Sequence, residues 1–225
     1  MNDKPWSDDE DDDDYDDDHI CNCSLPFGKI PDDAVFCGKS CMNRMLNIEC
    51  NKKYCPCGDR CQNQRFQRRE WAQTEIRDVG LKGRGLFTQQ DLKRGDFVIE
   101  YVGEVIDDEA YHARKHEYDG ERHFYFLSLD SQHVIDASRR GNKGRFINHS
   151  CNPNCELQKW NVGREMRIGI FAIKDISAGT ELTFDYAMEV YGMKRQKCYC
   201  GEPNCRGSIK SKDKEEKVLS AKQLE

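Results

Sequence analysis

Short apolar runs separated by turn residues dominate the chain from about residue 74 to residue 186. Residues 97–106 (FVIEYVGEVI) are rich in β-branched and aromatic side chains, which favours a strand. Glycine and serine turns separate further expected strands at 124–129, 134–136, 166–173 and 181–184. The charged stretch 109–118, which follows the N-cap candidates Asp107 and Asp108, predicts a helix. This pattern predicts a mostly-β domain with short helices.

Three other stretches do not show this pattern of apolar runs and turns. Residues 146–153 and 183–186 do not alternate cleanly, which indicates buried or irregular segments. Residues 62–69 (QNQRFQRR) predict a short basic helix. The longest apolar runs are far too short to cross a bilayer, so we expect no membrane span.

The segment between residues 21 and 61 is rich in cysteine and has few apolar residues at regular spacing. The chain has 13 cysteines among 225 residues, with 37% hydrophobic and 34% charged residues, a poor composition for one large apolar core. Disulfides in a secreted protein are one explanation, and metal binding in a reducing compartment is the other. The odd count, the tight spacings and the lack of a secretion-type leader favour zinc.

The cysteines fall into two clusters. In the first, a C-x-C pair at 21 and 23 and a C-x3-C pair at 37 and 41 precede Cys50, Cys55, Cys57 and Cys61. Eight thiols could fill two tetrahedral sites, and seven could do so with one bridging thiolate. The second cluster, Cys198, Cys200 and Cys205, is one ligand short. Cys151, Cys155 and His149 are the candidates for its fourth ligand.

Charge is unevenly distributed along the chain. The net charge is −6, but residues 1–19 hold 11 acidic residues and one lysine, so the remainder carries +4. Such an acidic leader should be disordered, and a solvated tail is favoured over a partner-binding or self-inhibiting arm. The polar residues 209–225 predict a flexible tail. A mildly basic body suits an anionic partner.

Three motifs follow one another in a specific order: GRGLF at 83–87, RFINHSC at 145–151 and ELTFDY at 181–186. Each alone is weak, because Gly-x-Gly often marks a turn and a lone histidine or tyrosine is often structural. Together they resemble the SET-domain lysine methyltransferases. Between the acidic leader (1–19) and the tail (209–225), the resemblance implies a zinc-binding AWS ("associated with SET") segment (20–72), a SET catalytic domain (73–190) and a post-SET zinc loop (191–208).

The AWS segment and the stretch NHSCNPNCELQKW are similar to the lineages that include the ASH, NSD and Set-two-type enzymes. That similarity implies an S-adenosylmethionine-dependent histone-lysine N-methyltransferase of the EC 2.1.1 class that acts on lysine 36 of histone H3. It also implies a nuclear, chromosomal protein that contacts the nucleosome and its DNA backbone. We expect a monomeric catalytic unit that could join a larger chromatin complex.

The resemblance also assigns site residues. S-adenosylmethionine is expected to contact Lys82, Gly83, Arg84, His123, Phe124, Tyr125, Asn148, His149, Gln196 and Tyr199. Arg84 departs from the tryptophan usual in the nearest lineages. The lysine channel is expected to consist of Tyr101, Tyr125, Phe184 and Tyr186. Phe184 stands where tyrosine restricts product size in the family, so at least dimethylation is expected.

Three zinc ions are implied by the same resemblance. Their ligand sets would be Cys21, Cys23, Cys37 and Cys41; Cys37, Cys50, Cys55 and Cys61, with Cys37 bridging; and Cys151, Cys198, Cys200 and Cys205. Cys57 and Cys155 fall outside these sets and are expected to be free thiols.

Other functions fit part of the sequence. A SET-fold chromatin-binding module without catalysis would keep the motifs, and a methyltransferase for lysine 4 or 9 of histone H3, or for a non-histone protein, would keep the chemistry. A zinc-dependent nucleic-acid binder would explain the cysteines and the basic 62–69 segment, but not the C-terminal motifs.

Overall fold

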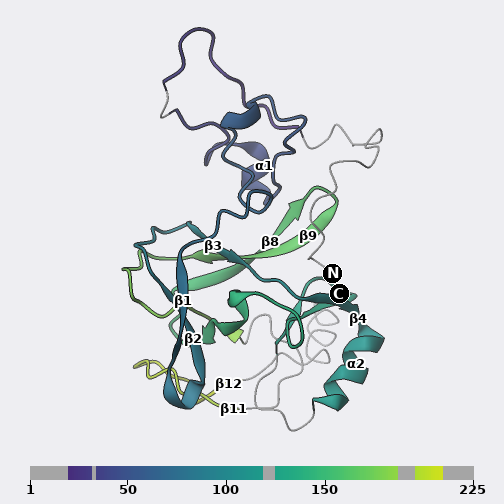
Figure 1. Cartoon of the computed structure of the whole chain (residues 1–225), viewed down its shortest axis with the longest axis vertical. Helices are drawn as coiled ribbons and strands as arrows, with labels where there is room; N and C mark the ends of the chain where they lie inside the picture. Colours follow the sequence, from purple (N-terminus) through teal and green to yellow (C-terminus); the bar gives the residue numbers. More distant parts are fainter. Residues whose placement is uncertain (1–19, 32–33, 119–124, 187–195, 210–225) are drawn as a thin grey trace, which may run out of the picture.

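The computed structural model describes residues 20–31, 34–118, 125–186 and 196–209. The expected leader (1–19) lies outside the described residues, as do His123, Phe124 and the tail beyond residue 209. Within those four ranges, no helix combines the length and apolar character needed to cross a bilayer. The cysteine-rich N-terminal segment stands at one end of the long axis of the molecule, with the strands below it (Figure 1).

Two three-stranded antiparallel sheets form the centre of the molecule. One has the order β3 (Phe97–Glu100), β9 (Glu165–Ala172) and β8 (Cys155–Val162), and the other β4 (Glu104–Asp107), β6 (His133–Asp136) and β5 (Phe126–Ser128). The pairs β1 (Thr74–Asp78) with β2 (Arg84–Thr88), and β11 (Gln196–Lys197) with β12 (Ser208–Ile209), are also antiparallel. The predicted mostly-β fold with short helices is confirmed.

The predicted strand at 97–106 is divided into β3 and β4 by residues 101–103. A Cβ at Gly103 would lie 2.6 Å from the backbone oxygen of Asp136, so only glycine allows this close approach. The break lets the two strands join different sheets and places Tyr101 at the end of β3.

The predicted helix is confirmed as α2 (Asp108–Glu117). The Asp107 side chain caps it by accepting a hydrogen bond from the Ala110 amide at 2.8 Å. Tyr111 is its buried anchor and packs edge-on against Phe126, with 5.1 Å between ring centroids. Arg114 pairs with the buried Asp136 of β6 at 2.6 Å, which ties the helix to the sheet.

The predicted basic helix at 62–69 is wrong, because this segment forms turns only. The Arg68 amide donates to the Gln64 carbonyl as in one helical turn, but Arg69 then takes a left-handed φ of 50°. The Glu70 amide reaches back to the Arg65 carbonyl and closes the turn, as at a helix C-terminus. The preceding segment holds α1 (Met42–Met45) and the 3-10 turn η2 (Gly58–Arg60).

The cysteine-rich segment is attached to the tip of β8. The Glu49 amide donates to the Asn161 carbonyl (2.9 Å), and the Asn161 amide donates to the Asn47 carbonyl (2.8 Å). Phe66 packs into an apolar cluster with Phe97, Trp160, Val162 and Phe171. Hydrogen bonds and apolar packing therefore fix the segment to the β3–β9–β8 sheet.

Two short stretches distant in sequence lie side by side at the functional end of the fold. β7 (Asn148–His149) pairs in parallel with β10 (Thr183–Phe184). The Asn154 side chain holds them together, since it donates to the Glu181 carbonyl and accepts from the Thr183 amide, each at 2.8 Å. These are the stretches predicted to be irregular or buried, and the 3-10 turns η3 (Gly80–Lys82) and η4 (Lys143–Phe146) flank them.

Candidate active site and cysteine clusters

A cavity of about 260 Å³ lies where four segments meet: the η3–β2 loop, the η4–β7 stretch, the end of β10 and the last cysteine loop. Its lining includes the cofactor residues predicted within the described part of the chain, namely Lys82, Gly83, Arg84, Tyr125, Asn148, His149, Gln196 and Tyr199. His123 and Phe124 lie outside the described residues. Segments separated by more than 100 residues therefore contribute to one pocket.

Glu181 holds the cavity wall together. Its carboxylate pairs with Lys82 Nζ at 2.5 Å and accepts a hydrogen bond from Asn148 Nδ2 at 2.9 Å. Asn148 also donates to the Arg84 carbonyl at 3.1 Å. A Cβ at Gly85 would lie 2.8 Å from the Glu181 carboxylate, so the second glycine of the GRGLF motif leaves room for this network.

The aromatic residues predicted to form the channel adjoin the cavity. The Tyr186 hydroxyl donates to the Ile147 carbonyl at 2.6 Å, and the Tyr101 hydroxyl donates to the Tyr125 carbonyl at 3.1 Å. The Phe184 ring lies 4.8 Å from that of Tyr186. Burial raises the pKa of both Tyr101 and Tyr186, so both phenols stay protonated at neutral pH.

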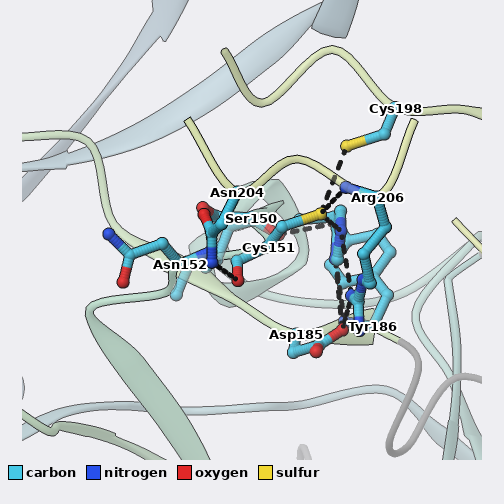
Figure 2. A network of polar contacts seen from close by, with 10 residues as sticks. Ser150, Cys151, Asn152, Asp185, Tyr186, Cys198, Asn204 and Arg206 are labelled. Atoms are coloured by element: carbon cyan, nitrogen blue, oxygen red, sulfur yellow. Dashed lines mark hydrogen bonds and ion pairs between the residues drawn. The ribbon is translucent and has the colours of Figure 1, made fainter. Parts of the chain in front are cut away.

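His149 connects the cavity to the last cysteine loop. Its Nδ1 accepts a hydrogen bond from the Tyr186 amide at 3.1 Å, which assigns the proton to Nε2, 3.4 Å from Cys151 Sγ. Burial lowers the pKa of His149, although Asp185 opposes this effect. Arg206 completes the arrangement by pairing with Asp185 at 2.7 Å (Figure 2). His149 is therefore a neutral, buried positioning group.

The first cysteine cluster gathers the thiols of residues 21–61. Two sets of four have Sγ atoms within 4.8 Å of one another: Cys21, Cys23, Cys37 and Cys41; and Cys21, Cys37, Cys50 and Cys55. The first is the predicted set. The second has Cys21 where Cys61 is predicted, although Cys61 is buried in the same cluster, as is Cys57.

The last cluster contains the predicted Cys151, Cys198, Cys200 and Cys205. A zinc–thiolate tetrahedron with bonds of about 2.3 Å has S–S edges of about 3.8 Å. Within the sets, the Sγ–Sγ separations are 3.9 Å for Cys151–Cys198, 3.7 Å for Cys21–Cys37 and 3.6 Å for Cys37–Cys55, so the clusters fit this ion. Cys155 is buried in β8 and belongs to neither cluster.

The structure adds residues to which the sequence gave no role. Glu181 lies inside the ELTFDY motif and Arg145 opens RFINHSC, so both were visible in motifs but without a role. The cavity lining also includes Phe146 of RFINHSC, the predicted zinc ligands Cys198 and Cys200, and Asp78, Leu81, Lys197 and Ile209. No sequence signal distinguishes the last four from ordinary loop residues.

Comparison with known proteins identifies two domains in the chain. The profile of the AWS domain matches residues 32–69, and that of the SET domain matches residues 83–187. Together with the fold and the cavity, these matches show that the chain belongs to the SET-domain family, with an AWS domain before the SET domain. The methyltransferase domain of human histone-lysine N-methyltransferase SETMAR is a structural neighbour. It has a TM-score of 0.66 and 29% identity, covering 74% of this chain and 68% of that one.

Among its relatives, the chain is 49% identical to histone-lysine N-methyltransferase ASHH2 of Arabidopsis thaliana over 193 residues, or 84% of this chain. It is 50% identical to the histone-lysine N-methyltransferase, H3 lysine-36 specific, of Emericella nidulans over 81% of its length. The chain spans only 11% and 19% of these two relatives. The similarity therefore concerns their AWS–SET region and not the whole proteins.

Proposed function

We propose that this protein is an S-adenosylmethionine-dependent protein-lysine N-methyltransferase that acts on lysine 36 of histone H3 and adds at least two methyl groups. The main support is the convergence of the NHSC segment, the Phe184–Tyr186 turn and the last cysteine loop on one cavity. The names of the relatives support the reaction class, and that of the Emericella nidulans relative specifies lysine 36 of histone H3.

The cavity residues suit the chemistry. S-adenosylmethionine would supply a methyl group on a positively charged sulfur, and Lys82, Arg84, Asn148, His149 and Tyr199 would hold it. The chain's own contribution is to align the amine and exclude water from it. Only the neutral amine attacks, and an aromatic channel disfavours the ammonium form by desolvation. The Tyr186 hydroxyl, fixed by its bond to the Ile147 carbonyl, would orient the amine.

We assign to Phe184, in the wall of the lysine channel, control of the number of methyl groups added. Phe184 is buried against Tyr186 and has no hydroxyl with which to bind a water or an amine hydrogen. An amine that already carries methyl groups therefore has room to bind again.

Three zinc ions are part of the proposal, two in the AWS segment and one in the post-SET loop. The sulfur separations given above support them. The third ion would join Cys151, which follows His149, to the loop that supplies Gln196 and Tyr199. Metal binding and assembly of the cofactor pocket would then be a single event.

A nuclear location on nucleosomes follows from the substrate. Residues 20–72 carry nine Lys and Arg against five acidic residues, whereas residues 73–209 carry 20 against 21. The basic excess thus lies in the AWS segment, which is the part we assign to DNA backbone contacts.

A mass-resolved methylation assay on recombinant nucleosomes tests the activity. Wild-type protein should add two or more methyl groups, and Tyr186→Phe should reduce the rate by about a hundredfold because the orienting hydroxyl is lost. No transfer by the wild type would favour a SET-fold binding module instead.

Nucleosomes in which lysine 36 of histone H3 is replaced by arginine test the substrate. We expect them to accept no methyl groups. If these nucleosomes accept as many methyl groups as before, the target is another lysine, and the proposed reaction class still holds.

A further inference from the structure

Arg145 and Lys197 are the cationic residues lining the cavity that the proposed mechanism does not use. Arg145 belongs to η4 and lines the cavity beside Tyr125, Asn148 and Tyr186. Its guanidinium carbon lies 4.1 Å from the centroid of the Tyr125 ring and 5.5 Å from that of Phe146. Two aromatic faces therefore hold the guanidinium in place.

The charge of Arg145 has no counter-ion within the described part of the chain. No Asp or Glu there lies within ion-pair distance of it, and its Nε is buried without a hydrogen-bond partner. Lys82, by contrast, is paired with Glu181 and Arg206 with Asp185. A guanidinium held by aromatic rings, with no carboxylate beside it, presents a net positive charge to the cavity.

The other charged groups around the channel leave that field uncancelled. Glu181 is neutralised by Lys82 and Asp136 by Arg114, while Asp78 is exposed and accepts from the Gly80 amide. His149 is neutral. Arg84 is exposed and lies over the Phe146 ring, and Lys197 lies over the Tyr199 ring.

The field of Arg145 reaches the channel tyrosines. Burial raises the pKa of Tyr101 and the neighbouring Tyr186 adds to this, whereas the charge of Arg145 lowers it. The Tyr101 hydroxyl is bonded to the Tyr125 carbonyl, so the ring under the guanidinium and this hydroxyl form one wall. An amine entering beside these tyrosines would feel the same positive charge.

We infer that Arg145 is an electrostatic positioning residue that disfavours the ammonium form of the target lysine, so that the proton is released to water before methyl transfer. This inference rests on the proposed function, because it requires a lysine amine among Tyr101, Tyr125 and Tyr186. Like charge at this range acts in addition to desolvation.

The test is the single-turnover rate of methyl transfer to nucleosomes, at saturating S-adenosylmethionine, as a function of pH. Arg145→Gln should move the rising limb of the profile to higher pH by about one unit, with about a tenfold lower rate at neutral pH that recovers in alkali. Arg145→Lys keeps the charge and should shift the limb much less. Arg77→Gln is the matched control, since Arg77 also stacks on an aromatic ring but does not line the cavity.

A second readout separates the field of Arg145 from its packing. A histone H3 peptide whose target lysine is replaced by S-aminoethylcysteine presents an amine of lower pKa. It should restore much of the neutral-pH rate of Arg145→Gln, which a packing defect would not allow. If the residue only holds the rings, Arg145→Lys and Arg145→Gln should slow the reaction equally at every pH.

The possible failures are distinguishable. Superimposable profiles of Arg145→Gln and an active wild type would overturn the inference and leave the proposed function intact. A slow Arg145→Gln that responds neither to pH nor to the analogue would do the same. A wild type inactive at every pH would overturn the proposed function together with this inference.

Discussion

Glu100, at the end of β3, is a buried carboxylate with few hydrogen-bond or ion-pair partners to offset its loss of hydration. It is 4% exposed, its Oε1 has no hydrogen-bond partner, and the nearest cation, Arg167, lies 3.9 Å away. Burial raises the pKa of Glu100 to about 7, although Arg167 opposes this effect. The neutral acid is therefore the form that the fold prefers.

The pH dependence of stability follows from this shift. The pKa of Glu100 is higher in the folded than in the unfolded state. The stability that its protonated carboxyl contributes is therefore fully present below pH 4.5 and is lost as the pH rises through 7. Glu100→Gln should be more stable than the wild type at pH 8, by about 2 kcal/mol, and nearly equal to it at pH 5. Urea unfolding at both pH values measures this difference. Glu165→Gln, which removes the exposed partner of Arg167, is the control and should show no such pH-dependent gain.

Single residues also mark the limit of what the sequence reveals. All the predicted cofactor residues that the structure describes line the cavity, and residues such as Lys82, Asn148 and Tyr199 lie in or beside recognisable patterns. These patterns gave no role to Glu181 or Arg145. Those roles depend on which side chains lie opposite, such as Lys82 for Glu181 and the Tyr125 ring for Arg145.

At the scale of elements, local signals predicted α2 well because its N-cap residue, Asp107, is of a type that can be recognised in the sequence. They failed at 62–69, where a basic stretch with helical composition is stopped after one turn by the left-handed Arg69. They also missed the division of 97–106, since the reason for it is the close approach of Gly103 to Asp136, a partner 33 residues away. Tertiary contacts overrode propensity at both places.

Gly169 in β9 determines how closely the AWS segment approaches the sheet. A Cβ there would lie 2.5 Å from Phe66 Cζ and 2.6 Å from Phe171 Cε2. Gly169→Ala should therefore force these rings apart and destabilise the protein by about 1–3 kcal/mol, as overpacking does. Denaturant unfolding measures this loss.

Gly38→Ala provides the comparison for that variant. The nearest atom to its new Cβ is Val35 Cγ1 at 3.5 Å, an ordinary contact, so its unfolding midpoint should change little. Equal unfolding midpoints for the two variants would show that the Phe66 cluster accommodates the added methyl group without a loss of stability.

At the scale of the whole molecule, metal would replace much of the apolar core at both ends. The main cluster of buried apolar side chains lies in the SET region, whereas the first cysteine cluster consists of thiols with Phe36. Without bound ions, the AWS segment would have little to hold it beyond Phe66 and the Asn161 hydrogen bonds.

Atomic absorption should find three zinc ions per chain, and Cys151→Ser should retain two. Because the third cluster carries Gln196 and Tyr199, Cys151→Ser should also weaken S-adenosylmethionine binding by at least about tenfold, measured by calorimetry. Cys155→Ser is the control and should keep three ions and full affinity. Two ions in the wild type, or loss of one in Cys155→Ser, would contradict the assignment.

The parallel pairing of β7 with β10 has a consequence for biosynthesis. Residues up to Ala172 suffice to build the β3–β9–β8 sheet, yet Asn148 and His149 find their neighbours only when residues 183–186 arrive. A nascent chain on the ribosome can therefore complete most of its scaffold while its reaction centre is still absent.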